Sequence, residues 1–173
     1  WTARILEALP DGMRFEVSYA GEYFGEFRSA LIGQHNLANL TAVVAQLHHL
    51  GASPARIAEA LDGYKGVKRR QTVFAEPRGI TLIDDFAHHP TAVRATIQAT
   101  RLRFGSQRSL WTVFEPRTNT TRRNIFQEAY GVAFNESDHL LVAPVHRVDS
   151  IPEEDRFSTD QLVRDALRQG VEA

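Results

Sequence analysis

The chain contains 173 residues, of which 20 are basic, 21 are acidic and none is cysteine, so its formal net charge is −1. This balance argues against binding to nucleic acid or to an anionic membrane surface, because such proteins usually carry a dominant basic patch. The lack of cysteine excludes disulfides, thiolate zinc sites and a cysteine nucleophile, and it fits a reducing compartment. No run of about 18 apolar residues predicts a membrane-spanning helix.

The first 29 residues predict an antiparallel meander. Apolar and polar residues alternate over 2–9, 13–20 and 22–29, and turn sequences with Gly12 and Gly21 separate these segments. The chain enters strand-like sequence at once, without an initial Met, so we expect it to be a piece of a longer protein.

Two helices are predicted next. Apolar residues at helical spacing over 37–50 indicate an amphipathic helix that ends at Gly51. Ser53 as N-cap and Pro54 in the first turn predict the start of a second helix, which Gly63 closes.

A short basic segment at 64–70 then precedes a different rhythm, so we place a domain boundary between residues 65 and 66. Strands and helices alternate beyond it. The expected strands are 71–76, 79–84, 109–114 and 138–143, and the expected helices are 90–103, 121–134 and 158–169. Ser158 and Gln161 form a capping box at the last helix. The strands at 109–114 and 139–143 are continuously apolar, which favours an α/β fold with parallel strands covered by helices on both faces.

Ligands of open α/β sheets bind beyond the carboxyl ends of the strands. In this chain those ends are polar at 84–90, 115–120 and 144–147. We expect these three polar segments to lie together as one rim at this edge of the sheet.

A polar set, His35, Asn36 and Asn39, lies at the start of the first predicted helix. Residues three and four apart project from one helix face, so an imidazole and amides there suit the donor and acceptor edge of a base such as adenine. The alternative is that His35 or Asn36 caps the helix while Asn39 faces solvent.

The basic triplet Lys68-Arg69-Arg70 lies at the predicted domain boundary. Guanidinium groups at such a junction can bind phosphates or hold two domains together. The alternative is a solvated linker.

Two carboxylates, Asp84 and Asp85, end a predicted strand, and His88 and His89 precede the next helix. A carboxylate at this place suits ribose hydroxyls or a magnesium shell, and the imidazoles suit a carboxylate or phosphate. The alternative is that one Asp bonds the loop backbone and His89 caps the helix. Adjacent histidines make a zinc site an unfavourable interpretation.

An arginine loop follows the strand at 109–114, with Arg117, Asn119, Arg122 and Arg123. The last two fall in the first turn of the predicted helix, where the macrodipole disfavours cations. We interpret this local conflict as a binding site for a ligand with several carboxylates. The alternative is ion pairing with acidic neighbours, Glu115 or Glu128.

The chain lacks the glycine-rich phosphate loops of common nucleotide-binding proteins and the HExxH motif. Four motifs in fixed order, HNLANLTAVVAQLHHLG, GVKRRQ, IDDFAHHPTAV and FEPRTNTTRR, resemble the Mur ligase family. The resemblance implies that 1–65 is the C-terminal part of a central ATP-binding domain. It also implies that 66–173 is most of a Rossmann-like C-terminal domain that binds the incoming peptide.

Family membership implies a cytoplasmic, ATP-dependent ligase that uses Mg²⁺. Its phosphate loop and catalytic lysine belong upstream, so the fragment is expected to be inactive alone. The implied nucleotide-binding residues of this chain are His35, Asn36, Asn39, Arg70 and Asp85. The implied peptide-binding residues are His88, His89, Arg117, Asn119, Arg122 and Arg123. No metal ligand is assigned within the chain.

The arginine loop favours a family member that joins the tripeptide L-alanyl-γ-D-glutamyl-meso-diaminopimelate to UDP-N-acetylmuramate through an acyl phosphate, in peptidoglycan recycling. A tripeptide with several carboxylates needs more arginine than free L-alanine does. Two alternatives remain, a member that adds L-alanine and a noncatalytic module that binds nucleotide or muropeptide.

Overall fold

The computed structural model describes residues 1–173, which form two compact units. The first contains residues 1–84 with 102–105, and the second contains 85–101 with 106–173. The domain boundary between residues 65 and 66 concerns the whole protein and stays a prediction.

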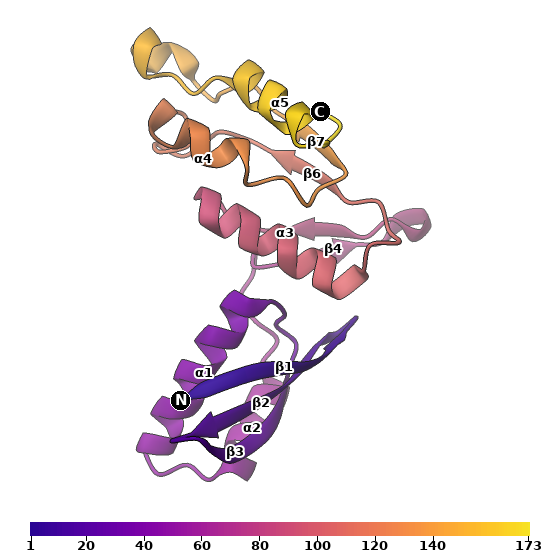
Figure 1. Ribbon diagram of the computed structural model, residues 1–173, viewed down its shortest axis with the longest axis vertical. Coiled ribbons are helices and arrows are strands. Elements are labelled where there is room, and N and C mark those ends of the chain that lie inside the picture. The colour runs from indigo at the N-terminus through magenta and orange to yellow at the C-terminus, as the bar shows by residue number, and fades with distance from the viewer. The chain divides into compact units, whose positions relative to one another are not determined.

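The first unit opens with a three-stranded antiparallel sheet, as the alternation predicted (Figure 1). Its strands are β1 (Thr2–Leu9), β2 (Gly12–Tyr19) and β3 (Glu22–Ser29). Every second residue of the central strand is fully buried, and these residues are Met13, Phe15 and Val17. The sheet therefore has one apolar face that needs a cover.

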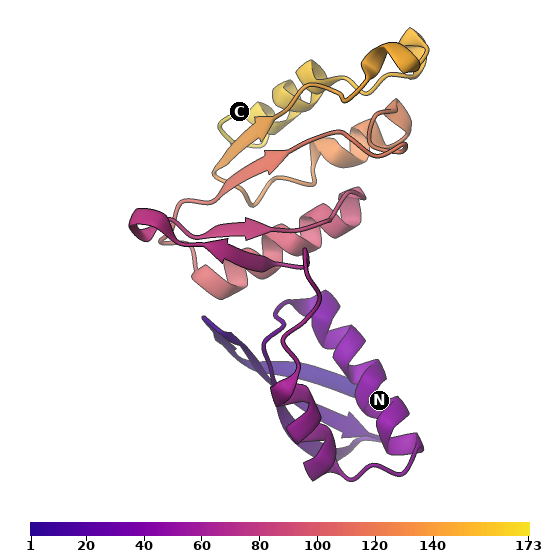
Figure 2. The ribbon, with the colours of Figure 1, turned by 180° about the vertical axis from the view of Figure 1, so that it is seen from behind.

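Helices α1 (Gln34–His49) and α2 (Pro54–Gly63) lie on the same side of this sheet (Figures 1 and 2). Both were predicted. Leu37 and Val44 of α1 are buried, and so is Ile57 of α2. Ser53 caps α2 as expected, its Oγ accepting a hydrogen bond from the Arg56 main chain at 3.5 Å.

The hairpin of β4 (Thr72–Ala75) and β5 (Leu82–Asp84) follows, and its two strands are antiparallel. A short 3₁₀ turn at Pro77–Gly79 joins them. Both strands were predicted, and both are shorter than the apolar pattern suggested, because the 3₁₀ turn takes up the start of the expected second strand. A register shift between Val73 and Ala75 interrupts their pairing.

The second unit has a parallel strand pair, β6 (Trp111–Phe114) and β7 (His139–Val142), in a mixed α/β arrangement. This confirms the predicted fold class. Three helices accompany the strands, α3 (Pro90–Phe104), α4 (Gln127–Gly131) and α5 (Thr159–Arg168). The helices and strands share one apolar core, whose buried residues are Val93, Ile97, Phe114, Tyr130, Ala133, Phe134, Leu140, Phe157, Leu162, Ala166 and Val171. Ser158 Oγ accepts from Gln161 N at 3.1 Å, as the capping box predicted.

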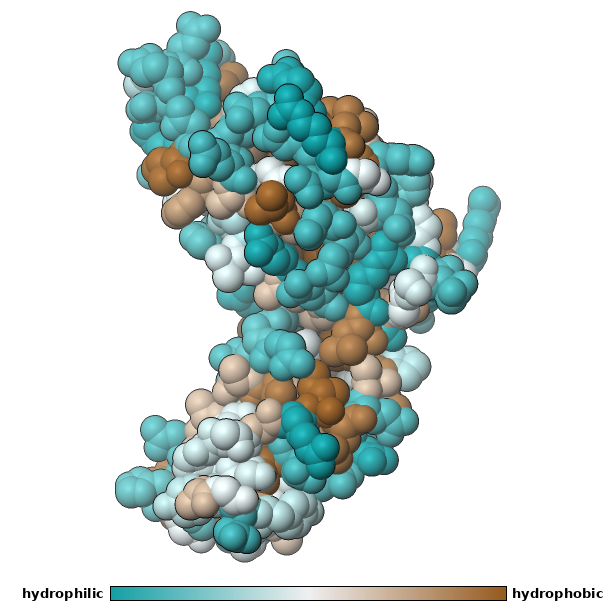
Figure 3. All heavy atoms as spheres, in the orientation of Figure 1, coloured by the Kyte–Doolittle hydropathy of each residue, from teal (hydrophilic) through white to brown (hydrophobic).

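The expectation of helices on both faces of these strands is wrong within this unit. No helix lies in front of β6 and β7 when the ribbon is seen from behind (Figure 2). Trp111, Val113 and Leu141 alternate with the core residues of the strands and are 57%, 72% and 51% exposed. The opposite side, with the helices, presents a largely hydrophilic surface (Figure 3).

The predicted helix at 121–134 is also wrong over its first half. Arg123 is extended, with φ −109° and ψ 154°, and only a 3₁₀ turn at Asn124–Phe126 precedes α4. Bonds to a distant segment replace the helical ones, because Arg123 forms a β-bridge with Arg156 and Phe157 N donates to Arg122 O at 3.0 Å.

Candidate functional site

The N-terminus of α1 carries three of the residues predicted to contact the nucleotide. His35 and Asn36 are half-buried in its first turn, and Asn39 is exposed. Asn36 Nδ2 donates to Ile32 O at 2.9 Å, which ties the amide to the main chain just before the helix. Because this amide donates and does not accept, the bond is not an N-cap. No side chain caps Gly33 and no acidic residue occupies the first turn, so the positive end of the helix dipole stays available to an acceptor. A role at adenine stays a prediction.

The basic triplet lies on an exposed segment before β4. Arg69 Nε pairs with Asp84 Oδ2 at 3.3 Å and so ties this segment to the end of β5. Arg70 is exposed, and its main-chain N donates to Val67 O at 3.1 Å. The role of Arg70 at ATP stays a prediction.

The loop after β5 is held by bonds within itself. Asp85 Oδ1 accepts from the main chain two residues on, at 2.7 Å, and His88 Nδ1 lies 3.0 Å from Phe86 O. His89 Nδ1 accepts from Thr91 N at 3.3 Å and so helps to begin α3. Both local alternatives therefore occur in the structure, while the two histidines remain exposed.

Contacts join the loops at the strand ends of the second unit. His146 N, after β7, donates to Pro116 O, after β6, at 3.1 Å. Arg122 Nη1 donates to His146 O at 3.4 Å. The His89 ring lies 4.7 Å from the Phe126 ring, edge to face. Three segments far apart in sequence thus form one rim, which we call the polar rim.

Arg122 is a cation of the polar rim whose side chain is bonded to neutral acceptors and to no carboxylate. Nη1 donates to Ser150 Oγ at 3.1 Å, and Nη2 donates to Asn119 Oδ1 at 3.1 Å. Its Nε is buried and donates to no protein acceptor. A guanidinium held by neutral acceptors keeps its full charge available, and its planar donors match a carboxylate or phosphate.

The other two arginines are paired with acids. Arg117 Nη1 lies 3.6 Å from Glu115 Oε1, and both side chains are largely exposed, so this pair is weak. Arg123 Nη1 lies 2.8 Å from Asp155 Oδ2. The ion-pair alternative, with Glu115 or Glu128 as partner, thus occurs at Arg117, whereas Arg123 pairs with an acid that was not predicted. The prediction that Arg122 and Arg123 lie in the first turn of a helix is wrong, because that turn does not form.

Two residues that contact the polar rim could not be identified from the sequence. Ser150 belongs to the turn after β7, and only its contact with Arg122 reveals it. Tyr130 falls within the predicted helix at 121–134 without being singled out, and its hydroxyl donates to the carbonyl of His88. Neither position carries a motif, because both contacts join residues far apart in sequence.

The chain supplies only part of what ATP and Mg²⁺ require. No group of three or more His, Asp or Glu residues is arranged to hold a metal ion. No glycine-rich loop offers a cradle for phosphates. The N-terminus of α1 fits a base edge and no more. No helix is both long and apolar enough to cross a membrane.

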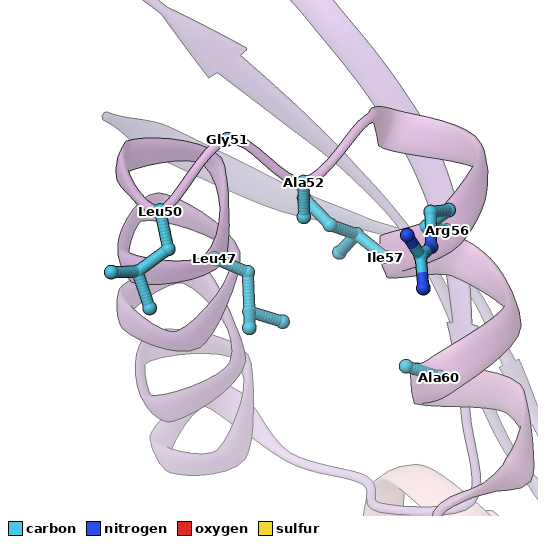
Figure 4. Close-up of a pocket in the computed structure, with 7 residues that line it drawn as sticks. All are labelled: Leu47, Leu50, Gly51, Ala52, Arg56, Ile57 and Ala60. Carbon is cyan, nitrogen blue, oxygen red and sulfur yellow. The ribbon is translucent and has the colours of Figure 1, made fainter.

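An open hollow of about 310 Å³ lies between the end of α1 and α2 (Figure 4). Leucine, isoleucine and alanine side chains line it, and Arg56 is its only charged residue. His35, Asn36 and Asn39 lie at the opposite end of α1, so this hollow is separate from these three predicted nucleotide-binding residues.

Comparison with known proteins adds independent findings. Residues 68–173 match the family described as Mur ligase, glutamate ligase domain. The chain is 36% identical over 147 residues to the Escherichia coli UDP-N-acetylmuramate–L-alanyl-γ-D-glutamyl-meso-2,6-diaminoheptandioate ligase, covering 84% of the chain and 32% of that protein. It is 35% identical over 152 residues to an Anaeromyxobacter dehalogenans UDP-N-acetylmuramate–L-alanine ligase, covering 88% and 32%.

Solved structures agree on the fold. The UDP-N-acetylmuramate–alanine ligase of Thermotoga maritima has a TM-score of 0.78 at 24% identity, over 99% of this chain and 36% of that one. The murein peptide ligase of Psychrobacter arcticus has a TM-score of 0.61 at 25% identity, over 98% and 34%. The chain therefore spans about a third of the length of these relatives.

Proposed function

The chain belongs to the Mur ligase family, and from this premise we propose that it is part of an ATP-dependent ligase that forms an amide bond to UDP-N-acetylmuramate. We propose the tripeptide L-alanyl-γ-D-glutamyl-meso-diaminopimelate as the amine substrate, which places the enzyme in peptidoglycan recycling. The phosphate loop and the catalytic lysine would come from the part of the whole protein that lies outside these residues.

The environment of Arg122 is the observation on which the proposed substrate rests. Its guanidinium is oriented by Asn119 and Ser150 and is paired with no acid. Arg117, in its weak pair with Glu115, is a second donor that a ligand carboxylate can recruit. A tripeptide offers several carboxylates to such a pair of donors, whereas free L-alanine offers one.

The residues of this chain bind and orient the amine component in this proposal. ATP supplies the activation, by turning the lactyl carboxylate into an acyl phosphate. The amine then attacks the carbonyl carbon, the C–N bond forms, the C–O bond to phosphate breaks, and the amine loses a proton. Fixing the peptide carboxylates at Arg122 would hold the amine in place for this attack, which lowers the entropic cost of the reaction.

A second candidate has its own support. The Thermotoga maritima structure named as an alanine ligase has the higher TM-score of the two, and the Anaeromyxobacter dehalogenans relative carries the same printed activity. We therefore keep the addition of L-alanine as the alternative. A noncatalytic module that binds nucleotide or muropeptide is the third reading.

The test uses the whole protein with Arg122→Lys and Arg122→Ala. We expect KM for the tripeptide to rise at least tenfold in both variants, because lysine keeps the charge and loses the planar pair of donors. The control is Arg164→Ala, an exposed position on α5, which leaves KM unchanged. An unchanged KM in the Arg122 variants would refute its role in substrate binding.

A further inference from the structure

Tyr130 carries a buried polar group that the proposed chemistry leaves unused. Its side chain is completely buried in α4, among aromatic rings whose centroids lie 5.1 Å away for Phe114 and 5.4 Å away for Phe157. The hydroxyl donates a hydrogen bond to the main-chain carbonyl of His88. Burial raises the pKa of Tyr130 to about 12, so the phenol stays protonated and remains a donor at neutral pH.

This bond differs in kind from the others in the loop after β5. The bonds of Asp85, His88 and His89 all join groups two residues apart, so they shape the loop without fixing its direction. The Tyr130 bond spans 42 residues. With the ring contact between His89 and Phe126, it connects the loop to the body of the unit.

The segment that carries Tyr130 also anchors the arginine loop. Gln127 Nε2 donates to Ser158 O at 3.0 Å, and Gln127 Oε1 accepts from Ser158 N at 2.7 Å. Just before it, Asn124 Nδ2 donates to Glu154 O at 2.7 Å. The five-residue helix α4 is thus bonded to the segment after β7 on one side and to the loop after β5 on the other.

We propose that Tyr130 is a positioning residue, which fixes His88 and His89 relative to Arg122 so that they act on one amine substrate. This inference rests on the proposed function. Without the hydroxyl, the His88 carbonyl loses its long-range partner, and the loop is free to turn towards water. The two histidines would then lose their fixed direction while the aromatic core stays filled.

The test compares Tyr130→Phe, which keeps the ring, with Phe134→Leu, which perturbs the same aromatic cluster without touching the loop. Hydrogen exchange measured by mass spectrometry on the whole protein needs no activity. In Tyr130→Phe we expect exchange over residues 86–89 to rise about tenfold, the equivalent of about 1.4 kcal/mol for one lost bond to a buried group. Exchange over the arginine loop should change less.

Phe134→Leu should raise exchange throughout the unit, with no excess at 86–89. In the active enzyme, Tyr130→Phe should raise KM for the amine substrate several-fold, whereas Phe134→Leu leaves it unchanged below its melting temperature. Unchanged exchange at 86–89 in Tyr130→Phe would overturn the proposal. If the wild-type enzyme shows no turnover while Tyr130→Phe still raises exchange at 86–89, the proposed function is overturned. The inference that Tyr130 positions the loop then stands.

Discussion

Replacing Gln127 with methionine tests how the second unit holds its loops together. Gln127 is buried, and its amide makes two hydrogen bonds to the main chain of Ser158. Methionine fills nearly the same space but can make neither bond. Each unsatisfied buried group costs about 1–3 kcal/mol, and water can reach the half-buried Ser158 in part. We expect a total loss of about 2–4 kcal/mol.

The loss also extends to α5, because Ser158 is its N-cap. Loss of the N-cap costs about 1 kcal/mol. The upper end of the expected loss of stability already includes this cost. Gln107→Met, at an exposed position of the second unit, is the control and should change stability by less than about 0.5 kcal/mol.

Urea unfolding followed by tryptophan fluorescence measures this difference. The Trp1→Phe background leaves Trp111 as the only tryptophan, so the signal reports on the second unit alone. Trp111 is stacked on His139 with ring centroids 4.1 Å apart, a contact that unfolding removes. A loss below about 1 kcal/mol would refute the idea that these two bonds anchor the segment.

Two further predictions concern stability. Gly12→Ala should cost at least about 1–3 kcal/mol, because φ is +146° and a Cβ would lie 2.0 Å from Ser29 O; Gly21→Ala, with open space around it, should cost less, and equal losses in urea unfolding would contradict the argument. Hydrogen bonding to Arg101 lowers the pKa of Asp138. Its stabilisation is therefore complete above the ordinary pKa of about 4 and disappears as pH falls through the lower folded value. In Asp138→Asn the free energy of unfolding should therefore fall less steeply as the pH is lowered into the acid range. An unchanged pH dependence in this variant would contradict the role given to Asp138.

The sequence predicted those parts of the fold that local signals determine. The meander follows from alternation and glycine turns, and α2 and α5 follow from Ser53 and Ser158 as caps. The polar rim follows from a topological rule about strand ends. These features depend on residues that are close together in sequence, so a single chain reveals them.

The failures occur where distant residues compete with local preference. Arg123 leaves the predicted helix because residues 153–158 offer it a bridge and a carboxylate from Asp155. The apolar pattern of β6 and β7 indicated helices on both faces, but Trp111, Val113 and Leu141 on one face are exposed, because a strand's own residues do not reveal which distant segments pack on it. The contacts of Arg122 with Ser150 and of Tyr130 with His88 could not be predicted for the same reason, because contacts that span 28 and 42 residues leave no local pattern.

The most direct test of the proposed function is ADP release by the whole protein with UDP-N-acetylmuramate and MgATP, offered either the tripeptide or L-alanine. The account predicts turnover with the tripeptide and little with L-alanine, and Arg122→Ala should abolish this preference by raising KM for the tripeptide. Turnover with L-alanine alone would contradict the choice of substrate, and no turnover with either would contradict the ligase assignment.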